Sequence, residues 1–137
     1  MIVADANLLI HLVCGTQQTE LARRIHASDS KWAVPPLWEP EVLNGLLSIY
    51  RAGLLEFEDA MTAWQNAVAV TSGHLCNCDP VSVLETAKQT GLTAYDAYYV
   101  TLARSLGVFL VSEDKQVLRA CPDVGRSMRD FLTDTAQ

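Results

Sequence analysis

Several features that would define a class of protein are missing from this 137-residue sequence. No apolar run approaches the roughly 20 residues of a transmembrane helix, and the opening residues lack the basic segment of a signal peptide. Only 10 Lys and Arg accompany 16 Asp and Glu, so the formal net charge of −6 excludes a broad basic surface for nucleic acid. The four cysteines have neither CxxC nor zinc-ligand spacing, which favours reduced thiols. We therefore expect a soluble, cytoplasmic protein without membrane attachment.

The sequence does contain enough apolar material for a core. Half of its residues are hydrophobic and 19% are charged, a composition that argues against intrinsic disorder. The length fits one domain, and no linker, repeat or low-complexity tract divides the chain. We expect residues 1–137 to form a single domain.

Short apolar runs alternate with longer amphipathic segments along the chain. The predicted strands are 2–4, 32–34 and 108–111, a weaker one at 74–77, and a final one within 125–132. The predicted helices follow the first strand directly and then occupy 19–27, 37–52, 57–70, 80–90, 94–105 and 114–120. This alternation predicts a three-layer α/β/α domain, in which helices cover both faces of a parallel sheet of four to five strands.

Four acidic side chains fall where this architecture would bring them to one edge of the sheet. Asp5 ends the first strand, and Asp114 lies just past the apolar strand at 108–111. Glu41 and Asp96 lie in the first turns of two helices that open toward the same edge. Ligands of an open parallel sheet bind beyond the carboxyl ends of its strands, so the four carboxylates would share one cleft. There they would raise one another's pKa unless a hard divalent cation such as Mg²⁺ or Mn²⁺ were bound.

Each acid also has a purely structural explanation. Asp5 and Asp114 are good N-caps for the helices that follow them. Asp96 forms a capping-box pattern with Thr93, and Glu41 could be an ordinary first-turn acid favoured by the helix dipole. No single acid decides between the two explanations, and their joint placement favours a site.

Four phrases of the sequence stand in a recognisable order. They are Asp5-Ala6-Asn7, PPLWEPEVLNGL (35–46), TAYDAYYVTLA (93–103) and VSEDKQVL (111–118). Together they resemble the PIN-domain ribonucleases, and they look most like the VapC-type toxins of toxin–antitoxin pairs. The resemblance spans residues 1 to about 120 and implies a PIN-like fold with metal-dependent hydrolysis of RNA phosphodiester bonds.

The resemblance also implies a role for each acid. Asp5, Asp96 and Asp114 would hold Mg²⁺ or Mn²⁺, and Glu41 would complete the catalytic set directly or through water. Glu39 is a second acid nearby, but the family phrase favours Glu41 as the ligand. Three polar residues are expected to orient the carboxylates or a bound water: Asn7, Thr93 and Ser112. At the last of these positions, serine replaces the threonine usual in the family.

The implied partners are an RNA substrate, a second copy of the chain, and an antitoxin whose tail lies in a hydrophobic groove near the site. The segments 37–52 and 57–70 are separated by only a few residues, which predicts an antiparallel helical hairpin. Its apolar stripe is expected to contribute to the homodimer, with burial inside a single chain as the alternative: Phe57, Met61, Trp64 and Val68.

Other classes of α/β protein fit less well. A receiver-like signalling domain needs an acidic pair and a lysine that this sequence does not place. A haloacid-dehalogenase-type phosphatase needs Asp-x-Asp after the first strand, where Asp5 is followed by Asn7. A PIN fold that acts as an RNA-binding or signalling module without catalysis is the remaining alternative, although all four acids are present.

Overall fold

A four-stranded parallel sheet forms the middle of the computed structural model, which describes residues 1–136. Its strands are β1 (Ile2–Ala4), β2 (Trp32–Ala33), β3 (Leu110–Val111) and β4 (Gly125–Arg126), in the order β2-β1-β3-β4. Within this sheet, Val3 stands opposite both Ala33 and Leu110. Because β1 is central and covered on both faces, all three of its residues are apolar and buried.

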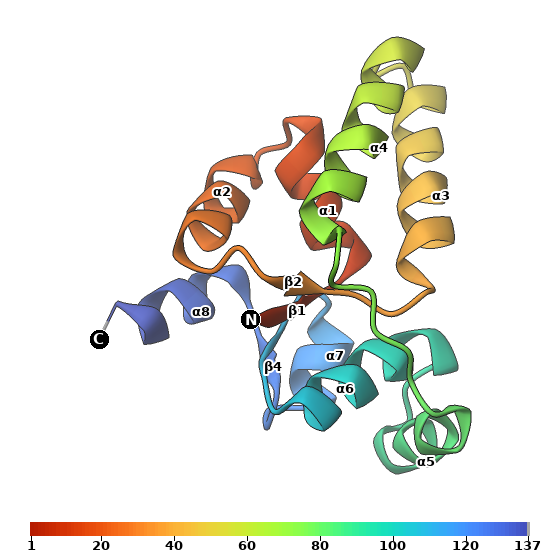
Figure 1. Ribbon diagram of the computed structural model, residues 1–137, viewed down its shortest axis with the longest axis vertical. Helices are drawn as coiled ribbons and strands as arrows, with labels where there is room; N and C mark the ends of the chain where they lie inside the picture. The colour runs from red at the N-terminus through yellow and green to blue at the C-terminus, as the bar shows by residue number, and fades with distance from the viewer. Residues whose placement is uncertain (137) are drawn as a thin grey trace.

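Helices cover the two faces of the sheet in separate layers (Figure 1). Within residues 1–136 they are α1 (Ala6–Cys14), α2 (Thr19–Ser28), α3 (Trp38–Arg51), α4 (Phe57–Thr71), α5 (Pro80–Thr90), α6 (Ala94–Leu106), α7 (Lys115–Ala120) and α8 (Met128–Thr135). Ile2 and Ala4 pack into the core beneath α1 to α4 and α8. Val3 points the other way, into a second core formed with α6 and α7. The three-layer prediction is confirmed.

The predicted hairpin is present as α3 and α4, two long helices that lie side by side (Figure 1). Trp38 and Trp64 stack between them, with ring centroids 5.0 Å apart and planes at 11°. Near the loop, Tyr50 and Phe57 meet edge to face at 5.5 Å. The apolar stripe of α4 is only partly covered, because Phe57 is 54% exposed and Met61 is 48% exposed.

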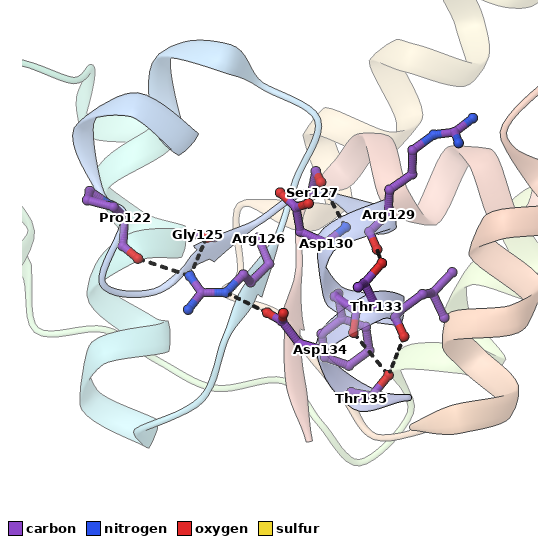
Figure 2. Close-up of polar contacts among 11 residues, drawn as sticks. Pro122, Gly125, Arg126, Ser127, Arg129, Asp130, Thr133, Asp134 and Thr135 are labelled. Carbon is purple, nitrogen blue, oxygen red and sulfur yellow. Dashed lines mark hydrogen bonds and ion pairs between the residues drawn. The ribbon is translucent and has the colours of Figure 1, made fainter. Parts of the chain in front are cut away.

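The C-terminal stretch differs from its prediction. The strand predicted within 125–132 is limited to β4, which ends at Arg126, and the chain turns at once into α8. Ser127 caps this helix by accepting a hydrogen bond from the Asp130 N–H at 3.1 Å (Figure 2). The pattern Ser-x-x-Asp is a helix-start signal that the sequence carries. The predicted final strand is therefore present within 125–132, but it covers only two residues, and the segment from Met128 onward is helix.

Arg126, the last residue of the edge strand β4, makes several contacts with neighbouring segments (Figure 2). Its Nε donates to Asp134 at 3.2 Å, and its Nη1 donates to the carbonyls of Pro122 and Gly125 at 3.0 and 2.8 Å. Its guanidinium carbon also lies 4.3 Å from the centroid of the Phe109 ring. These contacts tie β4 to α8 and leave the edge strand short, which blunts pairing with other chains.

The weak strand predicted at 74–77 is reduced to a single bridge between Leu75 and Val34. The Val34 N–H donates to the His74 carbonyl at 3.1 Å, and the Cys76 N–H donates to the Val34 carbonyl at 2.9 Å. The next donor in this register would be residue 36, which is Pro36 and has no N–H. The ladder stops for that reason.

Two further expectations concern the class of protein. All four cysteines are free thiols in the structure. Among the helices within residues 1–136, none has the length and apolar character needed to cross a membrane.

Candidate active site

The carboxyl ends of β1 and β3 open into a cleft of about 240 Å³. Asp5 follows β1 directly, and Asp114 follows β3 after a short loop. Glu41 comes from the first turn of α3, and Asp96 from the first turn of α6. The structure brings all four of these acids into the lining of one cleft.

The three supporting residues take two different places. Asn7 and Ser112 line the cleft, whereas Thr93 is not part of its lining. Thr93 instead caps α6, because its hydroxyl accepts a hydrogen bond from the Asp96 N–H at 3.2 Å. Ser112 is buried, and its hydroxyl accepts from the Asp114 N–H at 3.1 Å. Each of these two hydroxyls therefore fixes the backbone that carries one of the acids.

Asp5 and Asp114 are helix caps and cleft residues at once. The Oδ1 atom of Asp5 accepts from the Leu8 N–H at 2.8 Å. The Oδ1 atom of Asp114 accepts from the N–H groups of Gln116 and Val117 at 2.8 and 3.3 Å. Within residues 1–136 these capping bonds go to Oδ1 alone in both carboxylates. The structural and the functional explanations are therefore compatible, since the caps also orient the carboxylates.

Glu41 is held by a residue to which the sequence analysis gave no role. The Tyr99 hydroxyl donates a hydrogen bond to Oε1 of Glu41 at 2.5 Å, and the Tyr99 side chain also lines the cleft. Burial, together with this bond, raises the pKa of Tyr99 well above its usual range, so its hydroxyl stays a donor. The available signal was its place in the third phrase, one helical turn after Asp96. Glu39 is exposed and lies outside the cleft lining.

The negative charge of the carboxylates in the cleft has no basic side chain beside it among the described residues 1–136. Burial raises the pKa of Asp5 to about 6, repulsion from Glu41 and Asp114 adds to the shift, and the Ser112 hydroxyl opposes it. Burial also raises the pKa of Glu41 and of Asp96. No Lys, Arg or His belongs to the part of residues 1–136 that lines the cleft. A cleft of this kind attracts a cation.

The donor atoms indicate which kind of cation fits. Carboxylate oxygens suit hard divalent ions such as Mg²⁺ and Mn²⁺. As they stand, no three His, Cys, Asp or Glu side chains within residues 1–136 are close enough to enclose an ion unaided. Mg²⁺ usually keeps several waters and takes one or two carboxylates together with substrate phosphate oxygens. An open, acidic cleft therefore fits this ion class.

The fold and the cleft together define a three-layer α/β domain with a carboxylate site at the ends of its parallel strands. The family model of the PIN domain matches residues 2–121. The chain therefore belongs to the PIN domain family, and the resemblance predicted from the four phrases is confirmed.

Individual relatives agree with this membership. The chain is 30% identical over 125 residues to Ribonuclease VapC3 of Mycobacterium tuberculosis, in strains CDC 1551 / Oshkosh and H37Rv, with 88% of both chains covered. It also superimposes on the crystal structure of PAE2754 from Pyrobaculum aerophilum with a TM-score of 0.75. That comparison covers 98% of this chain and 88% of the other at 24% identity, and it shows the same fold.

Proposed function

We propose that this protein is a Mg²⁺- or Mn²⁺-dependent endoribonuclease and the toxin of a toxin–antitoxin pair, acting in the cytoplasm as one domain. The observation that carries the proposal is the cleft, in which four carboxylates meet and which no Lys, Arg or His of the described residues 1–136 lines. The similarity to a protein named as a ribonuclease supports RNA as the substrate.

The four acids have different proposed roles in this site. Asp5, Asp96 and Asp114 would hold the cation, with Glu41 contributing directly or through water. When bound, the cation supplies an activated water and neutralises charge on the phosphoryl oxygens. The capping bonds keep the Asp5 and Asp114 carboxylates oriented before substrate arrives, so little reorganisation is needed. Since the pKa of Asp5 is about 6, cation binding must weaken as the pH falls below that value.

The substrate that this surface favours is single-stranded RNA. No basic side chain within residues 1–136 lines the cleft, so phosphate binding there depends on the cation. Tyr95 is 63% exposed and lies one helical turn before Tyr99, next to Asp96. An exposed ring in this place offers a stacking surface for an unpaired base, and stacking does not require basic residues.

The proposed partners have a surface of their own on α3 and α4. An apolar groove of about 420 Å³ runs between the two helices, with Leu43, Leu47, Phe57 and Met61 among its lining residues. All four of these side chains are at least 36% exposed. Exposed apolar patches of this kind mark protein contacts, which supports a homodimer and an antitoxin partner.

Met61 is a better probe of this groove than Trp64, because Trp64 stacks on the buried Trp38 and its loss would disturb the fold. We expect the wild type to elute as a dimer and Met61→Glu to elute as a folded monomer, with a melting temperature that no longer depends on protein concentration. Leu84→Glu, on α5 and 66% exposed, is the matched control and should stay dimeric. A wild-type protein that is monomeric at micromolar concentration would contradict the homodimer.

The activity is tested with purified protein and a mixed pool of RNA. Cleavage should require Mg²⁺ or Mn²⁺, stop with EDTA, and fall strongly in Asp96→Asn. Cleavage that persists in EDTA would indicate a contaminating enzyme. Equal cleavage by the wild type and a folded Asp96→Asn variant would refute the site. RNA binding without cleavage in Mn²⁺ would favour the alternative of a non-catalytic RNA-binding module.

A further inference from the structure

We propose that Tyr99 is a positioning residue whose hydroxyl fixes the Glu41 carboxylate and thereby sets how tightly the cleft binds a divalent cation. The bond is short, at 2.5 Å, and joins residues 58 positions apart in the sequence. The inference rests on the cation site of the proposed function, but it needs no RNA for its test.

The two side chains differ in how firmly the fold holds them. Tyr99 is 4% exposed, and its ring packs in the second core with Val3 and Ala33 of the sheet. A buried tyrosine ring has only two side-chain torsions, so the position of its hydroxyl is determined by the core. Glu41 is only partly buried and has a longer, more flexible side chain. Because the hydroxyl is fixed by the core, the hydrogen bond restricts the position of the Glu41 carboxylate.

The bond also joins the two helical layers. Glu41 belongs to α3, which packs on one face of the sheet, and Tyr99 belongs to α6, which packs on the other. Within residues 1–136 it is the one side-chain hydrogen bond between these two helices. It crosses the carboxyl edge of the sheet inside the cleft. Without the hydroxyl, nothing described between α3 and α6 holds the carboxylate toward the other acids.

A buried tyrosine hydroxyl needs a hydrogen-bond partner, so the bond could exist only to satisfy the Tyr99 hydroxyl. That need does not explain why the partner is an acid. Glu41 lies beside Asp96, and burial together with this repulsion makes the ionised form of Glu41 unfavourable. A neutral acceptor would satisfy Tyr99 without that penalty. An acid in this position is accounted for by its use in the cleft.

The test measures Mn²⁺ affinity by calorimetric titration of the wild type and four variants. Tyr99→Phe keeps the ring and removes the hydroxyl, and it should weaken Mn²⁺ binding by about 10-fold, as loss of outer-sphere partners of metal ligands typically does. Tyr98→Phe is the matched control, since the Tyr98 hydroxyl forms no hydrogen bond to an acid within residues 1–136, and it should bind as the wild type does. Glu41→Ala and Glu41→Ala/Tyr99→Phe should have equal affinity, because Tyr99 acts through Glu41.

Three results would overturn the inference. They are an unchanged affinity in Tyr99→Phe, an equal loss in Tyr98→Phe, or a further 10-fold loss in the double variant. Wild-type protein that does not bind Mn²⁺ would overturn it together with the cation site. Wild-type protein that binds Mn²⁺ but cleaves no RNA would count against the proposed function alone.

A second measurement covers the case in which Tyr99→Phe does not fold. Wild-type protein labelled with ¹³C at Cζ of tyrosine is titrated with Mg²⁺ and followed by NMR. The Tyr99 resonance should shift more than that of Tyr98, and a Glu41→Gln variant should lose the difference. Equal shifts at the two tyrosines would refute the positioning role.

Discussion

The two ends of the sheet hold acids in opposite surroundings. At the amino ends of the strands, a cleft of about 650 Å³ contains Asp29 and Asp123. Asp29 pairs with the terminal amine of Met1 at 2.5 Å, and Asp123 pairs with Arg104 at 2.9 Å. At the carboxyl ends, the smaller cleft gathers four acids without any basic side chain among its lining residues in 1–136.

The pKa values move in opposite directions at the two ends. The hydrogen bond from Arg104 lowers the pKa of Asp123, whereas burial raises the pKa of Asp5, Glu41 and Asp96. An acid with a lowered pKa stabilises the fold when ionised, and an acid with a raised pKa destabilises it. Asp123 therefore contributes to folding when it is ionised. The ionised forms of Asp5, Glu41 and Asp96 oppose it, which favours a role for these residues in binding a ligand.

The largest expected contrast is in catalysis. Asp96→Asn removes one charge from the acidic cleft and leaves the Thr93 cap intact, because that cap uses the backbone N–H. We expect RNA cleavage to fall at least 100-fold, which corresponds to about 3 kcal/mol in the transition state. Asp123→Asn removes one charge from the opposite end and should cleave at the wild-type rate. Initial cleavage rates at saturating Mn²⁺ compare the two variants. Similar losses of rate in both would show that the acids at the two ends of the sheet do not differ in function.

The next contrast is in stability without metal. Because the pKa of Asp5 is raised to about 6 from 3.8, the stability that its neutral form gives is complete below pH ~4 and is lost as the pH rises through 6. Asp5→Asn keeps a side chain that can cap α1 and removes the charge. In EDTA at pH 7.5 it should raise the free energy of unfolding by up to about 3 kcal/mol, with little change at pH 4. Urea titrations at both pH values test this, and an equal effect at both would show that burial of the charge is not the cause.

Metal should narrow this difference in stability between Asp5→Asn and the wild type. Mn²⁺ at 100 times its dissociation constant should stabilise the wild type by about 2.7 kcal/mol, because it binds only the folded state. Asp5→Asn should gain much less, and Asp123→Asn should gain as much as the wild type. Thermal unfolding with and without Mn²⁺ measures the three gains. A full gain in Asp5→Asn would remove that residue from the ligand set.

The smallest expected effect is the change in stability when Asp123, which is paired with Arg104, is replaced. Asp123 and Arg104 have side chains 52% and 33% exposed, and exposed pairs of this kind contribute less than about 1 kcal/mol. Asp123→Asn should therefore destabilise the fold slightly at pH 7. Its pKa is lowered, so the stability that Asp123 contributes should decline as the pH falls from 3.8 through that lower pKa, whereas the stability that neutral Asp5 contributes declines as the pH rises. A urea series from pH 7 to pH 3 follows it, and a loss that grows in acid would contradict the pairing.

The sequence was sufficient to find the four acids because their placement follows from local rules. A strand end, two N-cap positions and two first helical turns can be recognised from neighbouring residues, and a parallel sheet sends its carboxyl ends to one edge. The same rules could have identified α8, because Ser127 and Asp130 form a helix start. That signal was missed, and a strand was expected instead.

The hairpin shows where such rules stop. The spacing of Phe57, Met61 and Trp64 predicts one apolar stripe, but it does not distinguish covered positions from exposed ones. The difference arises because Trp64 stacks on Trp38 of α3, whereas the Phe57 and Met61 side chains extend beyond that contact into the open groove. Packing between α3 and α4 therefore decides which side chains of the stripe remain exposed for contact with a partner.

By itself, the sequence determined seven of the eight helices described within residues 1–136, most of the strands and the edge at which the acids gather, since periodicity and capping act over a few residues. Only the tertiary structure decided which charges have partners. Tyr99 meets Glu41 across 58 positions, and Arg104 meets Asp123 across 19. Only the tertiary structure, likewise, buries Asp5 enough to raise its pKa to about 6. Charge pairing and desolvation depend on distances between segments that are remote along the chain, and those distances exist only once the layers have packed.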